Sequence, residues 1–158
     1  MVSKNIHIEK IINPEEKIQK EIDNFFNSGF FEVRVGNYIG NEIYYVIRDN
    51  NGDIIAARKV IYDLQKILKK TSFYERLKNH IDYNKKAYYL QALCVKKEEQ
   101  NKGYGSMILE ATMNDFEENS QVFGALYYTN TIKNKYFEKY NFQEISVEGK
   151  RIIIKRVN

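Results

Sequence analysis

Leu93-Cys-Val-Lys-Lys-Glu-Glu-Gln-Asn-Lys-Gly-Tyr-Gly105 is the stretch of this chain that decides its fold. It joins the strongly apolar residues 87–95 to an amphipathic segment through a charged loop that contains two glycines. The apolar residues predict a buried strand, and the amphipathic segment predicts a helix that opens at Gly103. A strand, a glycine loop and a helix in this order favour an anion site, because the first N–H groups of the helix are unpaired.

The two glycines of this loop allow the backbone to approach a ligand without interference from a Cβ atom. Lys102 adds a positive charge, so a pyrophosphate group is the expected guest. The loop does not end in the Gly-Lys-Ser/Thr of a P-loop. It also differs from a dinucleotide-binding fingerprint starting at Gly103, because Ile108 stands where the third glycine would be.

Short strands and helices are predicted on both sides of this stretch. Strands are expected at residues 6–12, 42–48, 53–62, 87–95, 122–128, 142–147 and 151–157, and helices at 14–28, within 64–86, at 103–116 and at 132–140. The first helix is expected to have Asn13 as its N-cap and Pro14 at its first position. Residues 30–41 fit either irregular backbone or a short helix and turn. Hairpins beside β-α-β units predict a mixed sheet.

Residues 49–52, Asp-Asn-Asn-Gly, predict a hairpin turn between the second and third strands. The segment superficially resembles a calcium-binding loop. Such a loop needs Gly at its sixth position and Glu at its twelfth, where this chain has Ile54 and Val60. The turn is therefore the preferred interpretation.

The composition predicts one globular domain spanning residues 1–158. The chain has 158 residues, of which 43% are hydrophobic and 29% charged, a balance typical of soluble proteins. The net charge of +4 is too small and too dispersed to predict a nucleic-acid partner. No apolar run approaches the roughly 18 residues that a membrane span needs, and no signal-peptide pattern opens the chain, so a cytoplasmic location is expected.

Cysteine and histidine are too sparse to predict a metal site. The single cysteine, Cys94, excludes a disulfide framework and a cysteine-cluster site for a metal. The two histidines, His7 and His80, lie far apart in the sequence, so a zinc enzyme is not expected.

Gln100-Asn-Lys-Gly-Tyr-Gly105 matches the Gln/Arg-x-x-Gly-x-Gly/Ala pattern of the GNAT superfamily of acyl-CoA-dependent N-acetyltransferases. Leu93-x-Val95 precedes it where the fourth strand of that family ends. Asn130, with Phe137-Glu-Lys-Tyr-Asn-Phe142 seven positions later, resembles the family's Asn…Tyr-Glu-Lys-x-Gly-Phe segment. The element order resembles the family over residues 6–157, whereas the specific motifs lie only within 93–142.

The resemblance implies a single-domain α/β (α+β) GNAT-like fold. Its mixed, mostly antiparallel central sheet would be splayed between strands four and five and flanked by helices. It also implies transfer of an acetyl group from acetyl-CoA to a primary amine, by direct attack in a ternary complex. The acceptor would be a small-molecule or peptide amine, and a homodimer is compatible with this fold.

The resemblance also implies how acetyl-CoA binds. The pantetheine arm would pair with backbone near Cys94, Val95 and Lys96, and the Val95 N–H would face the thioester carbonyl as an oxyanion donor. The other residues expected to bind the cosubstrate are Gln100, Asn101, Lys102, Gly103, Tyr104, Gly105 and Ser106 around the pyrophosphate, and Asn130 and Phe137 farther along the chain.

One chemical position departs from the family pattern. Where the family often has a tyrosine that protonates the departing CoA thiolate, this chain has Phe137. Tyr136 beside it is one candidate for the general acid, Tyr127 and Tyr128 on the preceding strand are others, and water is a further alternative. Each of these tyrosines, and Tyr140, is equally compatible with a packing role.

The general base is also left open. Gln91 lies in a region where the family often has a carboxylate, and an amide cannot act as a base. Glu98 and Glu99 follow the strand but fit a solvated loop better, so water relayed through polar strand groups is the default. Cys94 is compatible with an acyl-cysteine, although a small buried side chain is the simpler interpretation.

Two further alternatives remain. Without an evident acid and base, the chain also fits a GNAT-like module that binds acyl-CoA without transferring the acyl group. The lysine-rich residues 64–86 fit either a solvated helical face or a lid over the acceptor.

Overall fold

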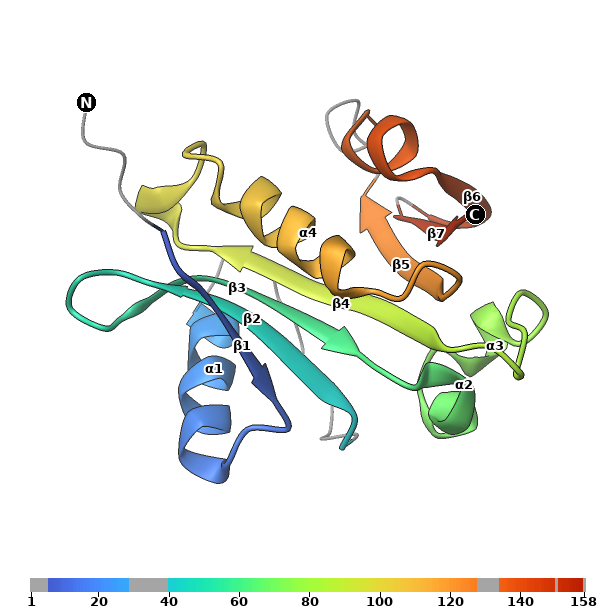
Figure 1. Ribbon diagram of the computed structural model, residues 1–158, viewed down its shortest axis with the longest axis horizontal. Coiled ribbons are helices and arrows are strands. Elements are labelled where there is room, and N and C mark those ends of the chain that lie inside the picture. The colour runs from blue at the N-terminus through green and yellow to red at the C-terminus, as the bar shows by residue number, and fades with distance from the viewer. Residues whose placement is uncertain (1–5, 29–39, 128–133, 150, 158) are drawn as a thin grey trace. The chain divides into compact units, whose positions relative to one another are not determined.

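The computed structural model describes residues 6–28, 40–127, 134–149 and 151–157. Figure 1 shows the helices and strands of the chain. The strands are β1 (Ile8–Ile12), β2 (Glu42–Arg48), β3 (Ile54–Ile61), β4 (Ala87–Val95), β5 (Gln121–Tyr127), β6 (Phe142–Glu148) and β7 (Arg151–Arg156). The helical segments are α1 (Glu16–Ser28), α2 (Leu64–Ile67), η1 (Leu68–Lys70), α3 (Tyr74–Leu77), η2 (Lys97–Glu99), α4 (Tyr104–Asp115) and the π-helical η3 (Asn134–Glu138).

The strands form a seven-stranded sheet in the order β1-β2-β3-β4-β5-β7-β6. The β1–β2, β5–β7 and β6–β7 pairs are antiparallel, and the β4–β5 pair is parallel. This arrangement confirms the mixed, mostly antiparallel sheet. In the β4–β5 pair, residues 87–90 face residues 121–124, while β4 itself continues to Val95. Strand β4 therefore pairs with β5 over its first residues and not over its last ones. A sheet that is splayed between these two strands has this pairing.

The chain divides into two compact units, which are residues 1–60 with 92–116, and residues 61–91 with 117–158. In the first unit, Ile22 and Phe26 of α1 pack in one apolar cluster with Tyr44 of β2 and Cys94 of β4. Tyr45 points to the other face of the sheet, and its hydroxyl donates to Asp115 Oδ2 of α4 at 2.9 Å. Helices α1 and α4 therefore pack against opposite faces of this unit's strands (Figure 1).

In the second unit, short helical segments replace the longer helix expected within residues 64–86. Phe73, just before α3, stacks on Tyr89 of β4 with ring centroids 4.2 Å apart. Arg76 forms an ion pair with Glu148 of β6 at 2.9 Å, and Lys155 Nζ donates to the carbonyl of His80 at 2.8 Å. These contacts tie the lysine-rich segment to β4, β6 and β7, although many of its lysines are exposed.

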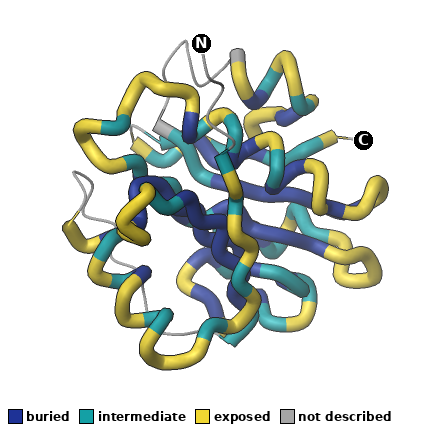
Figure 2. Tube along the Cα trace, turned by 60° about the vertical axis from the view of Figure 1, so that its left-hand side comes forward, coloured by how far each residue is buried: buried dark blue, intermediate teal, exposed yellow. Residues whose placement is uncertain are grey.

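Buried residues follow the strands, and exposed residues gather at the turns and loops (Figure 2). The predicted hairpin turn at residues 49–52 is confirmed. Asp49 N donates to Asp53 O at 2.9 Å, Gly52 N donates to Asp49 O at 3.1 Å, and Gly52 has φ +84°.

The predicted start of the first helix is wrong. Helix α1 begins at Glu16, and Asn13 has φ +45°. The Asn13 N–H donates to Glu42 O at 2.8 Å, and Asn13 Oδ1 accepts from Glu42 N at 3.0 Å. The side chain that would have capped the helix therefore pairs with the backbone at the start of β2.

A buried ion pair lies between β2 and β3. Lys59 Nζ is 2.9 Å from Glu42 Oε1, and both side chains are only 1% exposed. Tyr44 donates its hydroxyl to the other carboxylate oxygen at 2.9 Å and accepts from Gln19 Nε2 of α1 at 3.0 Å. Burial raises the pKa of Tyr44, so the phenol stays protonated as a donor. The network thus links α1 to β2 and β3 through two side-chain hydrogen bonds and one ion pair.

We predict that Lys59→Met lowers the free energy of unfolding by about 3–5 kcal/mol, because it leaves the Glu42 carboxylate buried without its cation. The double variant Lys59→Met, Glu42→Gln is expected to lose less than this single variant, since the uncompensated charge is gone. Urea unfolding measures both, with Lys20→Met on the exposed face of α1 as the control. A Lys59→Met variant as stable as the control would contradict the prediction.

Candidate functional site

The end of β4 has a fixed backbone orientation. The Lys96 N–H donates to Ile55 O of β3 at 2.8 Å. Successive N–H groups of an extended chain point to opposite edges, so the Val95 N–H points to the edge of β4 that faces away from β3. Of the three residues expected near the pantetheine arm, Lys96 therefore has its N–H engaged by β3, whereas the N–H of Val95 is directed to the opposite edge of β4.

The loop after β4 is folded back by its own side chains. Gln100 Nε2 donates to Val95 O at 3.2 Å, and η2 forms one short turn in between. Lys102 Nζ lies 2.9 Å from Glu99 Oε2, and this hydrogen bond raises the pKa of Lys102. Asn101 has φ +64°, a conformation that asparagine tolerates better than most residues. The predicted motif thus forms one continuous loop that leads into α4.

Helix α4 begins with a set of N–H groups that have no acceptor within the helix. Gly103 has φ +88° and provides no side-chain cap. The first helical hydrogen bond runs from Met107 N to Gly103 O at 3.0 Å, so the N–H groups of Tyr104, Gly105 and Ser106 precede it. These are the groups that the sequence assigned to an anion.

Both glycines of the motif fit this role. A Cβ atom built on Gly103 would meet no other atom within 4 Å, so the space outside this backbone is open. A Cβ on Gly105 would lie 3.6 Å from Leu93 Cδ2, an ordinary contact. The loop therefore leaves room for a ligand beside Gly103, while Gly105 faces the end of β4.

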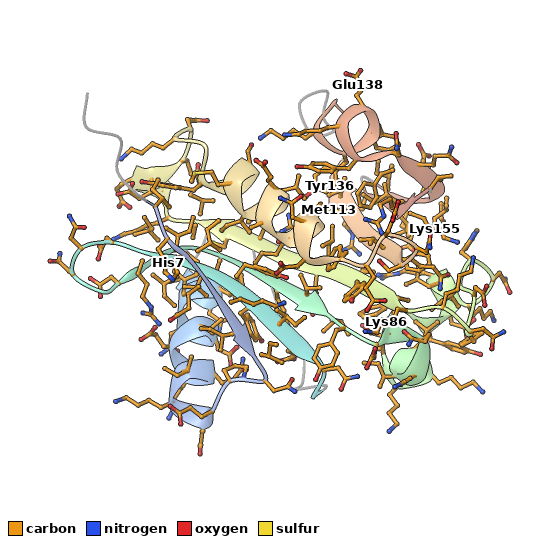
Figure 3. The ribbon with its side chains drawn as sticks, in the orientation of Figure 1. His7, Lys86, Met113, Tyr136, Glu138 and Lys155 are labelled. Carbon is orange, nitrogen blue, oxygen red and sulfur yellow. The ribbon has the colours of Figure 1, made fainter. Side chains whose placement is uncertain are left out.

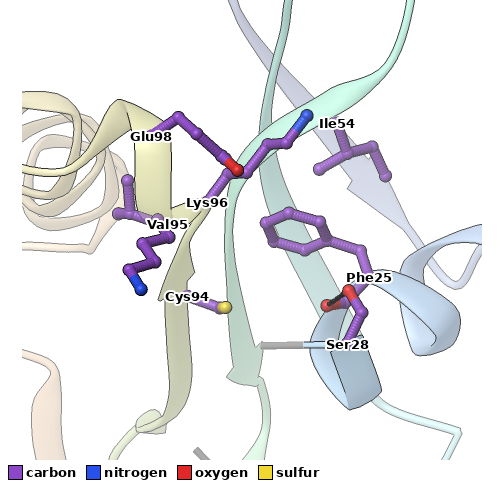
Figure 4. A pocket seen from close by; sticks show the side chains of 8 residues that line it. Phe25, Ser28, Ile54, Cys94, Val95, Lys96 and Glu98 are labelled. Carbon is purple, nitrogen blue, oxygen red and sulfur yellow. Dashed lines mark hydrogen bonds between the residues drawn. The ribbon is translucent and has the colours of Figure 1, made fainter. Parts of the chain in front are cut away.

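A cavity of about 420 Å³ opens at the same end of β4, toward α1. Phe25 and Ser28 come from the last turn of α1, and Ile54 comes from the start of β3 (Figure 4). The remaining lining residues are Cys94, Val95, Lys96, Lys97 and Glu98. Its volume lies within the range of small-molecule sites. The sequence did not predict this cavity, because its lining residues come from three separate segments with no shared motif.

Cys94 is a buried thiol at the base of this cavity. It is 4% exposed and belongs to the apolar cluster under α1. Burial raises the pKa of the Cys94 thiol, so the thiolate that a covalent acyl-cysteine route requires is disfavoured. These observations favour the interpretation of Cys94 as a small packing residue.

The aromatic residues expected near the thioester lie in the second unit. Tyr136 is 5% exposed and meets the Phe142 ring edge-on, with centroids 5.5 Å apart. Phe137 is partly exposed, and Glu138 projects outward from the same segment (Figure 3). The contact of Tyr136 favours packing over acid catalysis. Asn130 and Tyr128 lie outside the described residues.

Three other polar residues were considered from the sequence in connection with a general base. Gln91 Oε1 on β4 is buried and has no hydrogen-bond partner among the described residues. Glu98 is exposed and lines the cavity, whereas Glu99 is paired with Lys102. Of the two carboxylates considered from the sequence, only Glu98 therefore lies at the cavity.

The described part of the chain contains neither a metal-binding cluster nor a membrane-spanning helix. In these residues no three His, Cys, Asp or Glu side chains are placed to hold a metal ion. None of the described helices combines the length and the apolar character needed to cross a bilayer.

Comparison with known proteins adds information at the level of the fold. No protein-family model matches the chain, and no curated protein matches its sequence. Solved structures do match over nearly the full chain. Naa50 from Arabidopsis thaliana, in complex with the bisubstrate analogue CoA-Ac-MVNAL, is 13% identical with a TM-score of 0.64, covering 96% of this chain and 99% of that one.

Two further matches act on different acceptors. The ribosomal-protein-S18-alanine N-acetyltransferase from Escherichia coli is 13% identical with a TM-score of 0.62, covering 95% of this chain and 93% of that one. An aminoglycoside acetyltransferase from an uncultured soil metagenomic sample is 16% identical with a TM-score of 0.58, covering 94% and 96%. Together with the mixed seven-stranded sheet and its parallel β4–β5 pair, these matches show that the chain has the fold of the GNAT superfamily of N-acetyltransferases.

Proposed function

We propose that the protein is an N-acetyltransferase that moves an acetyl group from acetyl-CoA to a primary amine by direct attack in a ternary complex. The observation that carries this proposal is the glycine loop that leads from β4 into α4. It combines two features, which are three helical N–H groups that precede the first helical hydrogen bond and open space beside Gly103; the nearby Lys102 is paired with Glu99 in this structure. A pyrophosphate matches both features.

The residues of this loop hold the cosubstrate. The N–H groups of Tyr104, Gly105 and Ser106 bind the pyrophosphate, and Gln100, Asn101, Lys102 and Gly103 shape the loop around it. The backbone near Val95 holds the pantetheine arm. The structure of Naa50 with a CoA-based analogue supports a CoA ligand for this fold.

In the proposed reaction the amine nitrogen attacks the carbonyl carbon of the thioester. The Val95 N–H donates to the carbonyl oxygen as negative charge develops on it. In comparable sites one such donor stabilises the transition state by about 2.7–4 kcal/mol. The C–S bond then breaks, the amide forms, and CoA leaves as a thiolate. The proton lost by the amine passes to water, because Gln91 cannot accept it.

A strong general acid is not required for the leaving group. A thiol with a pKa of about 8.5 leaves as a fairly stable anion at neutral pH, so protonation contributes only about 2 kcal/mol. Phe137 in place of a tyrosine is therefore compatible with transfer. Tyr136 remains a candidate acid, although its ring packs against Phe142.

A second candidate function is a module that binds acyl-CoA without transferring the acyl group. It is favoured by the amide of Gln91 on β4 and by Phe137, because both lack the expected acid–base chemistry. Release of free CoA thiol in the presence of a panel of amines distinguishes the two functions. Continuous thiol release that depends on the amine supports the transferase, and tight binding without release supports the module.

Binding of CoA itself tests the proposal first. We expect acetyl-CoA or CoA to raise the melting temperature, since a ligand at 100 times its dissociation constant adds about 2.7 kcal/mol of stability. Thermal unfolding at increasing CoA concentration measures the effect. An unchanged melting temperature at millimolar CoA would remove the basis of the proposal.

A matched pair of glycine variants tests where CoA binds. Gly103 and Gly52 have φ +88° and φ +84°, and a Cβ on either would meet no other atom within 4 Å. Gly103→Ala and Gly52→Ala should therefore lose similar stability, about 1–2 kcal/mol each, through backbone strain. Only Gly103→Ala is expected to lose CoA affinity, because its Cβ occupies the space of the pyrophosphate.

Isothermal titration of CoA into both alanine variants, alongside urea unfolding, makes this comparison. Equal CoA affinity in the two folded variants would place the pyrophosphate elsewhere.

Substitutions at the two adjacent aromatic positions test the general acid. We predict that Phe137→Tyr does not reduce acetyl transfer, and that Tyr136→Phe loses less than about a hundredfold in kcat. The reason is that any thiol-protonating group contributes at most about 2 kcal/mol, or about 30-fold. Steady-state kinetics with an accepted amine measure both variants. A thousandfold loss in Tyr136→Phe with unchanged CoA affinity would identify Tyr136 as the acid.

A further inference from the structure

The connection between β3 and β4 carries the whole net charge of the chain. Residues 63–86 contain seven Lys or Arg and three Asp or Glu, a net charge of +4, which equals the net charge of all 158 residues. This segment, the basic connection, includes α2, η1 and α3 (Figure 1). The positive charge is therefore concentrated in one part of the chain, which its small total did not lead us to expect.

We propose that the basic connection is a docking surface for a single-stranded nucleic acid. The proposal concerns binding alone and includes no group transfer. It does not depend on acetyl transfer, because none of its residues belongs to the glycine loop or lines the cavity at the end of β4.

Several cations of the basic connection are free to meet an anion. Lys69, Lys70 and Lys85 are exposed, and their ammonium groups have no ion-pair partner among the described residues. Lys66 is 71% exposed and lies 3.8 Å from Asp63 Oδ2, a loose pair. Lysines that neutralise phosphates release the counterions around a nucleic acid, and this release drives binding.

The apolar side chains of the same stretch are already buried in the fold. Leu64 of α2 is fully buried, and Leu68 of η1 is 1% exposed. A helix that binds a membrane surface needs its apolar face free to enter the bilayer. The stretch from α2 to η1 therefore presents cations without the apolar side chains that a membrane requires.

An exposed aromatic ring lies in the same connection. Tyr83 is 46% exposed, and it precedes Lys85 and Lys86 by two and three positions. Unpaired bases of a single strand stack on exposed aromatic rings while nearby cations bind the phosphates. The combination of free lysines and an exposed ring therefore favours a single-stranded nucleic acid over a polyanion that has no bases.

Gln121 at the start of β5 holds the backbone around this ring in place. Its Oε1 accepts from Asp82 N at 2.7 Å, and its Nε2 donates to Asp82 O at 2.7 Å and to Lys85 O at 3.2 Å. Its own N–H donates to Lys86 O at 2.8 Å, and Gln121 is only 6% exposed. A surface that is already ordered loses less entropy on binding. These contacts favour a permanent surface over a lid.

Fluorescence anisotropy with the full chain and labelled oligo(dT) or oligo(U) measures binding. We expect a Kd of about 10 µM in about 50 mM salt, which weakens steeply as salt is added. The two oligonucleotides are expected to bind alike, because phosphates and stacked bases are common to both. Inorganic polyphosphate of equal charge is expected to bind several times more weakly, since it has no bases to stack.

A pair of double variants tests whether the position of the charges matters. Lys69→Gln with Lys70→Gln removes two free cations of the basic connection. Lys17→Gln with Lys20→Gln removes two exposed cations of α1 and changes the net charge equally. The first double variant is expected to lose about tenfold in affinity and about 1.4 in the slope of log K against log salt, and the second less than about twofold.

Substitutions of Tyr83 test the stacking. Tyr83→Ser is expected to weaken oligo(dT) binding by about fivefold, the lower range of base stacking on an exposed ring. Tyr83→Phe is expected to keep the wild-type affinity, because it keeps the ring. Melting temperatures of all variants verify that each is folded before its affinity is compared.

Each outcome decides the proposal. No binding at about 100 µM protein in about 50 mM salt overturns it. Equal losses in the two double variants overturn the assignment to the basic connection. Unchanged affinity in Tyr83→Ser, or polyphosphate bound as tightly as oligo(dT), shows a surface for polyanions without stacking and overturns the nucleic acid. Tighter binding to phosphatidylserine vesicles than to oligo(dT) overturns it as well.

Discussion

The hydrogen bond from the Lys96 N–H to the Ile55 carbonyl sets the direction of the last peptide groups of β4. Because neighbouring N–H groups of an extended chain alternate, this bond turns the Val95 N–H away from β3. The Val95 carbonyl is held in turn by the Gln100 side chain, which folds the loop back toward the strand. The site at the end of β4 therefore depends on one backbone contact and on one side chain of the predicted motif.

The same geometry separates the glycine loop from the cavity. Leu93 contacts the Gly105 side of the loop, whereas Cys94 belongs to the cluster under α1. Successive side chains of a strand point to opposite faces, so the loop before α4 and the cavity beside α1 approach the end of β4 from opposite faces. Val95 is the residue after Cys94, so its side chain is on the same face of the strand as that of Leu93. Val95 also lines the cavity.

The sequence predicted most of the elements that hold the loop, for identifiable reasons. The apolar residues 87–95 and the glycine pair at 103 and 105 have strong local signals, and β4 and α4 formed there. The start of α1 was wrong because Asn13 pairs with Glu42, a partner 29 positions away that no local pattern reveals. The burial of Lys59 has the same origin, since its partner Glu42 lies on another strand.

The candidate site also has one part that the sequence predicted and one part that it did not. Its loop is one continuous motif and could be predicted, whereas the cavity joins Phe25, Ile54 and Cys94 from three separate segments. Only the packing of α1 on the sheet brings these residues together, so the sequence gives no local signal for them.

The central claim is that acetyl-CoA binds at the start of α4, and glycine-selective ¹⁵N labelling tests it most directly. The chain has eight glycines, of which Gly103 and Gly105 lie in the loop and Gly52 lies in the turn between β2 and β3. On titration with CoA, the amide resonances of Gly103 and Gly105 should shift most, while that of Gly52 stays in place. Unmoved resonances of Gly103 and Gly105 at saturating CoA, with shifts confined to other glycines, would contradict the account.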